Sequence, residues 1–118
     1  MKTILVAEDN DSNYILMTYI LRRDYQFKRA KNGEEAVEMV DAENFDLILM
    51  DVKMPLMDGL QATKTIKERY PDLPVIALTA NAFESDRQLA FEAGCDDFLA
   101  KPVNSAKCLE TIAKFIGK

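Results

Sequence analysis

The sequence predicts an α/β fold in which five parallel strands form a doubly wound sheet with helices on both faces. Three observations predict it. Short, continuous apolar runs recur along the 118 residues, and such runs are typical of parallel strands that are buried on both faces. The segments between them return apolar residues every three or four positions, as amphipathic helices do. Strand and helix patterns alternate five times, which favours parallel strands joined by right-handed helical crossovers.

The first half of the predicted fold begins with a strand over residues 3–8. Asp11 is expected to cap the helix that follows from about Ser12. The run YQFKRA at 25–30 is less apolar, which predicts a more exposed strand at an edge of the sheet. Asn32-Gly33 is expected to form a strand-to-helix turn, because the EEAVEMV after it has helical rather than alternating spacing.

The remaining strands are predicted over 46–51, 74–79 and 96–101, each around a continuous apolar run. The helix between the first two of these ends within ERYPDLPV, because a residue before proline is disfavoured in a helix. Ser85 and Gln88 form a predicted capping box for the next helix. A last helix is predicted from apolar residues at helical spacing, namely Cys108, Leu109, Ile112, Phe115 and Ile116.

Composition narrows the classes of function. The formal charge of −5, from 20 acidic and 15 basic residues, disfavours direct binding to nucleic acid or to an anionic membrane surface. No apolar run is long enough for a signal peptide or a bilayer span, so we expect one cytoplasmic domain over residues 1–118. The chain contains no histidine, which excludes Ser-His and Cys-His nucleophile pairs, histidine-bound zinc and a role as a phosphohistidine donor.

Reactive side chains stand where the predicted strands end: Glu8 and Asp9, Asp51, Thr79 and Lys101. In the flavodoxin-like strand order 2-1-3-4-5 these ends share one edge of the sheet, and the acidic residues lie at the switch point where ligands bind. Clustered carboxylates repel one another unless a cation shares the site, and hard oxygen ligands suit Mg²⁺. With a metal neutralising the charge, Asp51 can attack a phosphoryl group to form an acyl phosphate. Lys101 and the Thr79 hydroxyl can hold the phosphoryl oxygens.

Four motifs, AEDN, ILMDVKMPLMDG, ALTA and FLAKP, occur in this order along the chain. Together they resemble the receiver domain of two-component response regulators, over essentially the whole chain. The resemblance implies that Asp51 accepts phosphate. It implies that Mg²⁺ binds to Asp9, Asp51 and the backbone carbonyl of Lys53, with Glu8 acting mainly through a metal-bound water. It also implies that the Lys101-Pro102 peptide bond is cis.

The same resemblance implies a conformational switch at Phe98. On phosphorylation, Thr79 would move toward the phosphoryl group and Phe98 would turn inward, which changes the face of the fourth helix, fifth strand and fifth helix. A plain core aromatic is the alternative for Phe98, since packing alone also favours an aromatic there. Two positions depart from the commonest pattern of the family: Glu8 replaces an aspartate, and Lys53 brings an ammonium group beside the site.

The implied function is a signalling receiver that takes a phosphoryl group from the phosphohistidine of a sensor histidine kinase or histidine phosphotransfer protein. It would then act on a downstream effector protein. Such a receiver is not a conventional enzyme, because it catalyses only its own phosphorylation and dephosphorylation at Asp51. The chain ends after the last helix with no output domain attached, so we expect a stand-alone regulator. A receiver excised from a longer protein is the alternative.

Two other classes of protein fit parts of the pattern. A haloacid dehalogenase-type phosphatase also places a nucleophilic aspartate after a strand, but it needs a second acid two residues later, where this chain has Lys53. A small nucleotide- or flavin-binding domain shares the fold. It needs a phosphate-cradling, glycine-rich turn after the first strand, where AEDNDSN places negative charge instead.

Overall fold

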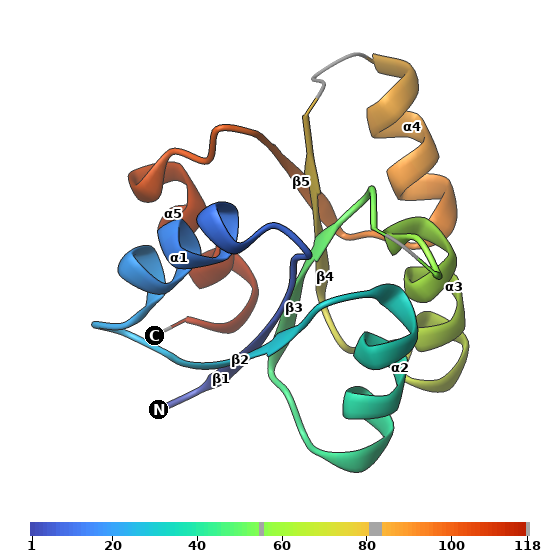
Figure 1. The fold of residues 1–118 in the computed structure, drawn as a ribbon, viewed down its shortest axis with the longest axis horizontal. Coiled ribbons are helices and arrows are strands. Elements are labelled where there is room, and N and C mark those ends of the chain that lie inside the picture. The colour runs from blue at the N-terminus through green and yellow to red at the C-terminus, as the bar shows by residue number, and fades with distance from the viewer. Residues whose placement is uncertain (55, 81–83, 118) are drawn as a thin grey trace.

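Strands and helices alternate along the chain in the computed structural model, which describes residues 1–54, 56–80 and 84–117. The elements are β1 (Thr3–Ala7), α1 (Asp11–Leu21), β2 (Gln26–Ala30), α2 (Gly33–Ala42), β3 (Leu47–Asp51), α3 (Gly59–Arg69), β4 (Val75–Thr79), α4 (Glu84–Ala93), β5 (Asp97–Ala100) and α5 (Ser105–Ile116). The strands pair in parallel in the order β2-β1-β3-β4-β5 (Figure 1). The predicted fold class and strand order are therefore confirmed.

Helices cover both faces of the sheet. α1 and α5 lie on one face, and α2, α3 and α4 lie on the other (Figure 1). Side chains alternate between the two layers, so that Ile4 and Val6 of β1 pack toward α1 and α5 while Leu5 packs on the opposite side. All residues of β3 and β4 are buried, which explains why their sequences are continuous apolar runs.

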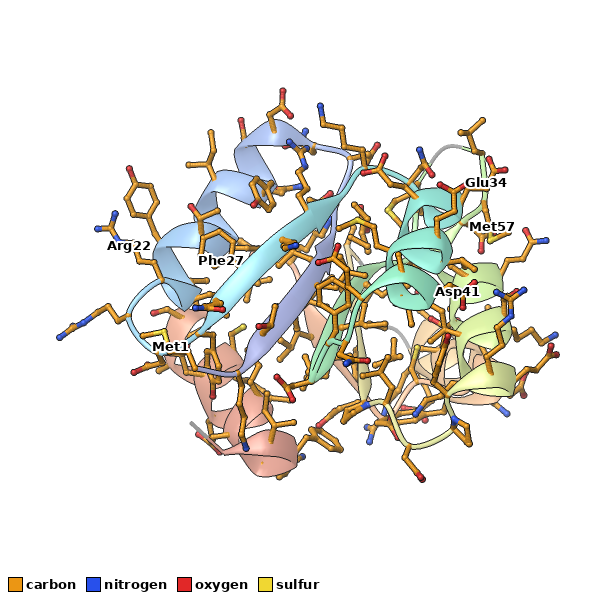
Figure 2. All side chains as sticks on the ribbon, turned by 90° about the horizontal axis from the view of Figure 1, so that it is seen from below. Met1, Arg22, Phe27, Glu34, Asp41 and Met57 are labelled. Carbon is orange, nitrogen blue, oxygen red and sulfur yellow. The ribbon has the colours of Figure 1, made fainter. Side chains whose placement is uncertain are left out.

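β2 is the exposed edge strand that the sequence predicts. Its residues alternate between exposed and less exposed positions, and only Ala30 is fully buried. Phe27 lies on the side of β2 that faces α1 (Figure 2), where its ring meets the edge of Tyr14 at a centroid distance of 6.4 Å. Packing on one face only accounts for the weaker apolar signal of this strand.

Four of the helices begin at a side-chain cap of the same kind. Asn10, Asn32, Asp58 and Asn104 each accept a hydrogen bond from the backbone amide three residues later. The prediction of a strand-to-helix turn at Asn32-Gly33 is confirmed. The prediction of Asp11 as the first cap is wrong, because Asn10 has the extended backbone that a cap needs and Asp11 is already helical.

The predicted capping box of α4 is also wrong. Ser85 lies inside the helix, which begins no later than Glu84, so its side chain does not cap the helix start. Residues 81–83, which precede α4, are outside the part of the chain that the structure describes. The end of this helix is well defined, since Gly94 has a φ of 109°, a left-handed conformation that favours glycine.

The observed strands are one or two residues shorter than predicted. β1 ends at Ala7 and β5 at Ala100, so Glu8 and Lys101 follow their strands instead of closing them. The backbone amide of Glu8 still pairs with the carbonyl of Ala30, at 2.9 Å. Its own carbonyl accepts a hydrogen bond from the Arg29 side chain, at 3.1 Å, instead of from a neighbouring strand. The ladder therefore stops at the acidic pair.

No helix within residues 1–54, 56–80 and 84–117 has both the length and the apolar character needed to cross a membrane. α5 has 12 residues, whereas a helical span of a bilayer takes about 20.

Candidate functional site

The carboxyl ends of four strands surround one cleft. Glu8 and Asp9 follow β1, Asp51 ends β3, Thr79 ends β4 and Lys101 follows β5. The cleft has a volume of about 270 Å³, and all five of these side chains line it. The structure therefore brings together every reactive residue that the sequence places at strand ends.

Three carboxylates and one ammonium group form the centre of the cleft. Glu8 is 1% exposed and Asp51 is 5% exposed, whereas Asp9 is open to solvent. One oxygen from each of the three acids lies within 4.8 Å of the others. Nζ of Lys101 lies 2.9 Å from Oε1 of Glu8 and 3.2 Å from Oδ1 of Asp51. One cation therefore faces two buried acids.

This imbalance of charge changes the acidity of Asp51. Burial, the hydrogen bond to Glu8 and the charge of Glu8 raise its pKa, and although Lys101 lowers it, the net result is a pKa of about 7. Burial opposes the charged form of Lys101, but the hydrogen bond to Glu8 and the charges of both acids outweigh it, so the pKa of Lys101 is raised. The pair of buried acids thus holds a proton near neutral pH unless a further cation replaces it.

The loop after β3 is built against the backbone of Asp51. The amide of Gly59 donates to the carbonyl of Val52 at 2.9 Å. A Cβ atom at Gly59 would lie 2.0 Å from the carbonyl oxygen of Asp51, a distance that no side chain can occupy. Asp58 caps α3 immediately before it. The tight turn explains why MDG follows the acidic strand end at this spacing.

Arg29 supports the acidic pair from β2, and sequence reasoning missed it. Its Nε atom donates to the carbonyl of Glu8, and its Nη1 atom pairs with Asp11 at 2.9 Å. Its guanidinium group also stacks on the ring of Tyr14, 4.6 Å from the centroid. An arginine in a weakly apolar edge strand gives no signal of this role, because the contacts are made across elements.

Thr79 and Lys101 are held together by the backbone as well as by the cleft. The Lys101 amide donates to the Thr79 carbonyl at 2.7 Å, and the Thr79 side chain is buried. The Lys101-Pro102 peptide bond is cis, so this expectation is confirmed.

Lys53 lines the cleft beside Asp51, and its backbone amide lies 3.4 Å from Oδ1 of that acid. Phe98 does not line the cleft. It is half-buried on β5, packs against the core layer of α2, α3 and α4, and opens onto a separate surface cleft. Asp86 of α4 lines the acidic cleft, although no motif in the sequence indicates it.

The donor set of the cleft fits a hard divalent cation. Three carboxylates offer oxygen ligands within mutual reach, and two of them are buried with a single ammonium group as counter-charge. Mg²⁺ prefers oxygen ligands, and it commonly takes one or two carboxylates while keeping several waters. The exposed position of Asp9 leaves one side of such a site open to a further ligand.

The comparison with protein families gives one match over nearly the whole chain. The model of the response regulator receiver domain matches residues 4–113. Among curated proteins, the polar-differentiation response regulator DivK of Brucella anthropi is 34% identical over 119 residues, which cover 98% of this chain and 97% of that protein.

Two solved structures place these features in context. The receiver domain of the sensor histidine kinase PA1611 from Pseudomonas aeruginosa PAO1, with a magnesium ion coordinated in its active-site cleft, is 37% identical. Its TM-score is 0.91, over 99% of this chain and 98% of that one. The receiver domain of Ssk1 from Saccharomyces cerevisiae, crystallised with the histidine phosphotransfer protein Ypd1, is 31% identical. Its TM-score is also 0.91, over 97% of this chain and 88% of that one.

Proposed function

The chain belongs to the response regulator receiver domain family, and from this premise we propose that it accepts a phosphoryl group on Asp51 and thereby switches a protein-interaction face. One observation carries the proposal. Asp51 is a buried carboxylate at the end of β3 that shares a single ammonium group with Glu8 and lies within reach of Asp9. That arrangement suits a nucleophile that works beside a divalent cation.

The cation would be Mg²⁺, held by Asp9, Asp51 and the backbone carbonyl of Lys53, with Glu8 acting mainly through a bound water. The magnesium ion in the cleft of the PA1611 receiver domain supports this choice. When bound, the ion supplies positive charge that offsets the carboxylates and the incoming phosphoryl oxygens. It also favours the deprotonated, nucleophilic form of Asp51, because it replaces the proton that the raised pKa retains.

The transfer follows from the positions of the side chains. An Asp51 oxygen forms a new bond to phosphorus as the phosphorus–nitrogen bond of the donor imidazole breaks, and the electron pair of that bond stays on the imidazole. Lys101 and the hydroxyl of Thr79 bind phosphoryl oxygens as charge builds on them. Ala80 beside Thr79 is small and exposed, which leaves room for the donor to approach. Hydrolysis of the acyl phosphate at the same site returns the receiver to its starting state.

In this proposal, phosphorylation changes the shape of one protein-interaction surface. As Thr79 moves toward the phosphoryl group, Phe98 turns inward, and the face formed by α4, β5 and α5 takes a second arrangement that an effector protein recognises. The surface position of Phe98 beside α4 and α5 supports this role. Coupling between a site and such a face is typically about 1–3 kcal/mol.

The donor would be a sensor histidine kinase or a histidine phosphotransfer protein, and the site of action the cytoplasm. The complex of the Ssk1 receiver with Ypd1 supports a donor of this kind. The whole of residues 1–118 would act as one receiver domain, which the family match over residues 4–113 supports.

The experiment is phosphorylation by acetyl phosphate in the presence of Mg²⁺, followed by intact mass spectrometry. We expect one added phosphate on the wild type, none on Asp51→Asn and none in excess EDTA. Asp72→Asn is the matched control, because Asp72 is exposed, distant in sequence and changes charge by the same amount. Loss of the adduct in Asp72→Asn as well, or its retention in Asp51→Asn, contradicts the proposal. Turnover of many equivalents of phosphoester would indicate a phosphatase.

A further inference from the structure

Arg87, in the first turns of α4, is stacked between two aromatic rings. Its guanidinium carbon lies 5.5 Å from the ring centroid of Phe91, one turn further along α4, and 5.5 Å from that of Phe98 on β5. Arg87 and Phe98 line the same surface cleft. The cation thus links the helix to the side chain that the proposed function makes the moving part.

Within residues 1–54, 56–80 and 84–117, the side chain of Arg87 is held by these two ring contacts. Among the residues that the structure describes, no carboxylate lies within ion-pair distance of it, although the chain is acidic overall. Lys114 in the same cleft is different, because its ammonium group pairs with Asp97 at 2.8 Å. A planar, weakly hydrated guanidinium is well suited to stacking on aromatic faces, and an ammonium is less so.

The ring of Phe98 packs against the core layer of α2, α3 and α4 on one side. Within the sheet, its neighbour across the β4–β5 pair is Ala77, a small residue of the same layer. On the side of the surface cleft, the Arg87 guanidinium lies over the ring. Any inward turn of Phe98 removes its ring from Arg87, whereas the Phe91 contact lies within α4 and does not depend on that turn.

We infer that Arg87 is a positioning residue that holds Phe98 in its surface-facing arrangement and so sets the starting balance of the switch. The inference rests on the proposed function, since it assigns a regulator to the same phosphorylation event. A cation–π contact at an exposed site corresponds to about a two- to fivefold change in an equilibrium constant. Loss of the Arg87 contact would therefore shift the balance toward the inward arrangement by about that factor.

The coupling between the arrangement of Phe98 and the phosphorylation of Asp51 acts in both directions. If the inward arrangement of Phe98 favours phosphorylation of Asp51, removal of Arg87 raises the phosphorylated fraction at a limiting concentration of acetyl phosphate. Linkage requires phosphorylation to favour the inward arrangement by the same factor by which the inward arrangement favours phosphorylation, so the rise in phosphorylation is at most as large as the shift of the switch. Arg87 does not line the cleft around Asp51, and the contact that joins it to the proposed switch is the one with the Phe98 ring.

The test is a double-mutant cycle, with the phosphorylated fraction measured by intact mass. Arg87→Met keeps the aliphatic stem and removes the cation. Lys107→Met is the matched control, because Lys107 lines the same cleft and carries the same charge but makes no ring contact. We expect about a two- to fivefold rise in the ratio of phosphorylated to free protein for Arg87→Met, and no rise for Lys107→Met. In a Phe98→Leu background the Arg87→Met effect should vanish, and in a Phe91→Leu background it should persist.

Fluorine NMR of protein labelled with fluorophenylalanine gives a second readout, with the Phe98 signal assigned from Phe98→Leu. In Arg87→Met we expect this signal to move toward its position in the phosphorylated protein. An equal effect of Lys107→Met, an Arg87→Met effect that survives in Phe98→Leu, or an unchanged Phe98 signal overturns the inference while wild-type phosphorylation stands. Absence of phosphate on wild-type Asp51 overturns the proposed function itself, and the inference with it.

Discussion

Nζ of Lys101 lies 2.9 Å from Oε1 of Glu8, a carboxylate that is 1% exposed. These residues come from opposite parts of the chain and meet because β1 and β5 end at the same edge of the sheet. The charge of Glu8 has almost no access to water, so the ammonium group is its main source of stabilisation. The contact therefore supports the fold as well as the proposed chemistry.

Replacement of this ammonium group should destabilise the protein. Lys101→Met leaves Glu8 and Asp51 buried without a cation, and breaking a buried pair in this way costs about 3–5 kcal/mol in other proteins. Lys101 is partly exposed, so we expect a loss of about 2 kcal/mol in the free energy of unfolding, measured by urea denaturation in EDTA. The exposed Lys64→Met is the control and should change the value little. An unchanged stability of Lys101→Met would contradict the assigned ion pair.

The raised pKa of Asp51 predicts a stability that falls with rising pH in the absence of metal. The folded protein holds the proton up to about pH 7, whereas the unfolded chain releases it near 3.8. Between these values the folded state binds more protons, so the free energy of unfolding decreases as the pH rises. Asp51→Asn cannot lose a proton and should escape this decrease. We expect it to be more stable than the wild type by about 4 kcal/mol at pH 8.

Thermal unfolding in EDTA across pH 4 to 8 checks whether stability falls or rises with pH. The curves of wild type and Asp51→Asn should meet near pH 4 and diverge as the pH rises. A gap that stays constant, or a wild type that gains stability relative to Asp51→Asn toward pH 8, would show that Asp51 is charged in the fold at all these values.

Much of the fold is encoded locally, which is why it could be predicted. The apolar runs of β3 and β4 are continuous because both faces are covered, and these patterns are visible in the sequence itself. The residues at which helices begin were harder to predict. Asn10 and Asp11 are both good capping residues, and only the backbone conformation decides between them. Ser85 fits a capping motif but lies within α4.

The residues of the site likewise divide into those that could be predicted from the sequence and those that could not. The reactive residues of the cleft could be predicted because strand ends of a parallel sheet converge, so position along the chain is enough. Arg29 and Arg87 could not, since each acts through contacts between elements that have no fixed sequence spacing. Asp86 of α4 likewise lines the cleft through the packing of the fold and not through a sequence motif.

The close approach of Gly59 to the backbone of Asp51 predicts that a side chain at position 59 is not tolerated. Gly59→Ala would place a Cβ 2.0 Å from the Asp51 carbonyl oxygen, and backbone cannot move aside as a flexible side chain can. We expect a loss of about 1–3 kcal/mol in stability and weaker binding of Mg²⁺, measured by calorimetric titration. Ala62→Gly, in the same helix, is the control for a change of helix stability without the clash. Normal Mg²⁺ binding by Gly59→Ala would contradict the idea that this turn positions Asp51.

Binding of Mg²⁺ should depend on pH because it competes with a proton. Below the pKa of Asp51, about 7, the site must release one proton for each ion that it takes up. The apparent affinity should therefore rise about tenfold per pH unit from pH 5 and level off above pH 7.

Calorimetric titration in two buffers with different heats of ionisation counts the released protons directly. About one proton should be released per Mg²⁺ ion at pH 6 and almost none at pH 8. Asp51→Asn removes the competing proton, so its weaker binding should lose this dependence. An equal slope in both proteins would place the titrating group elsewhere.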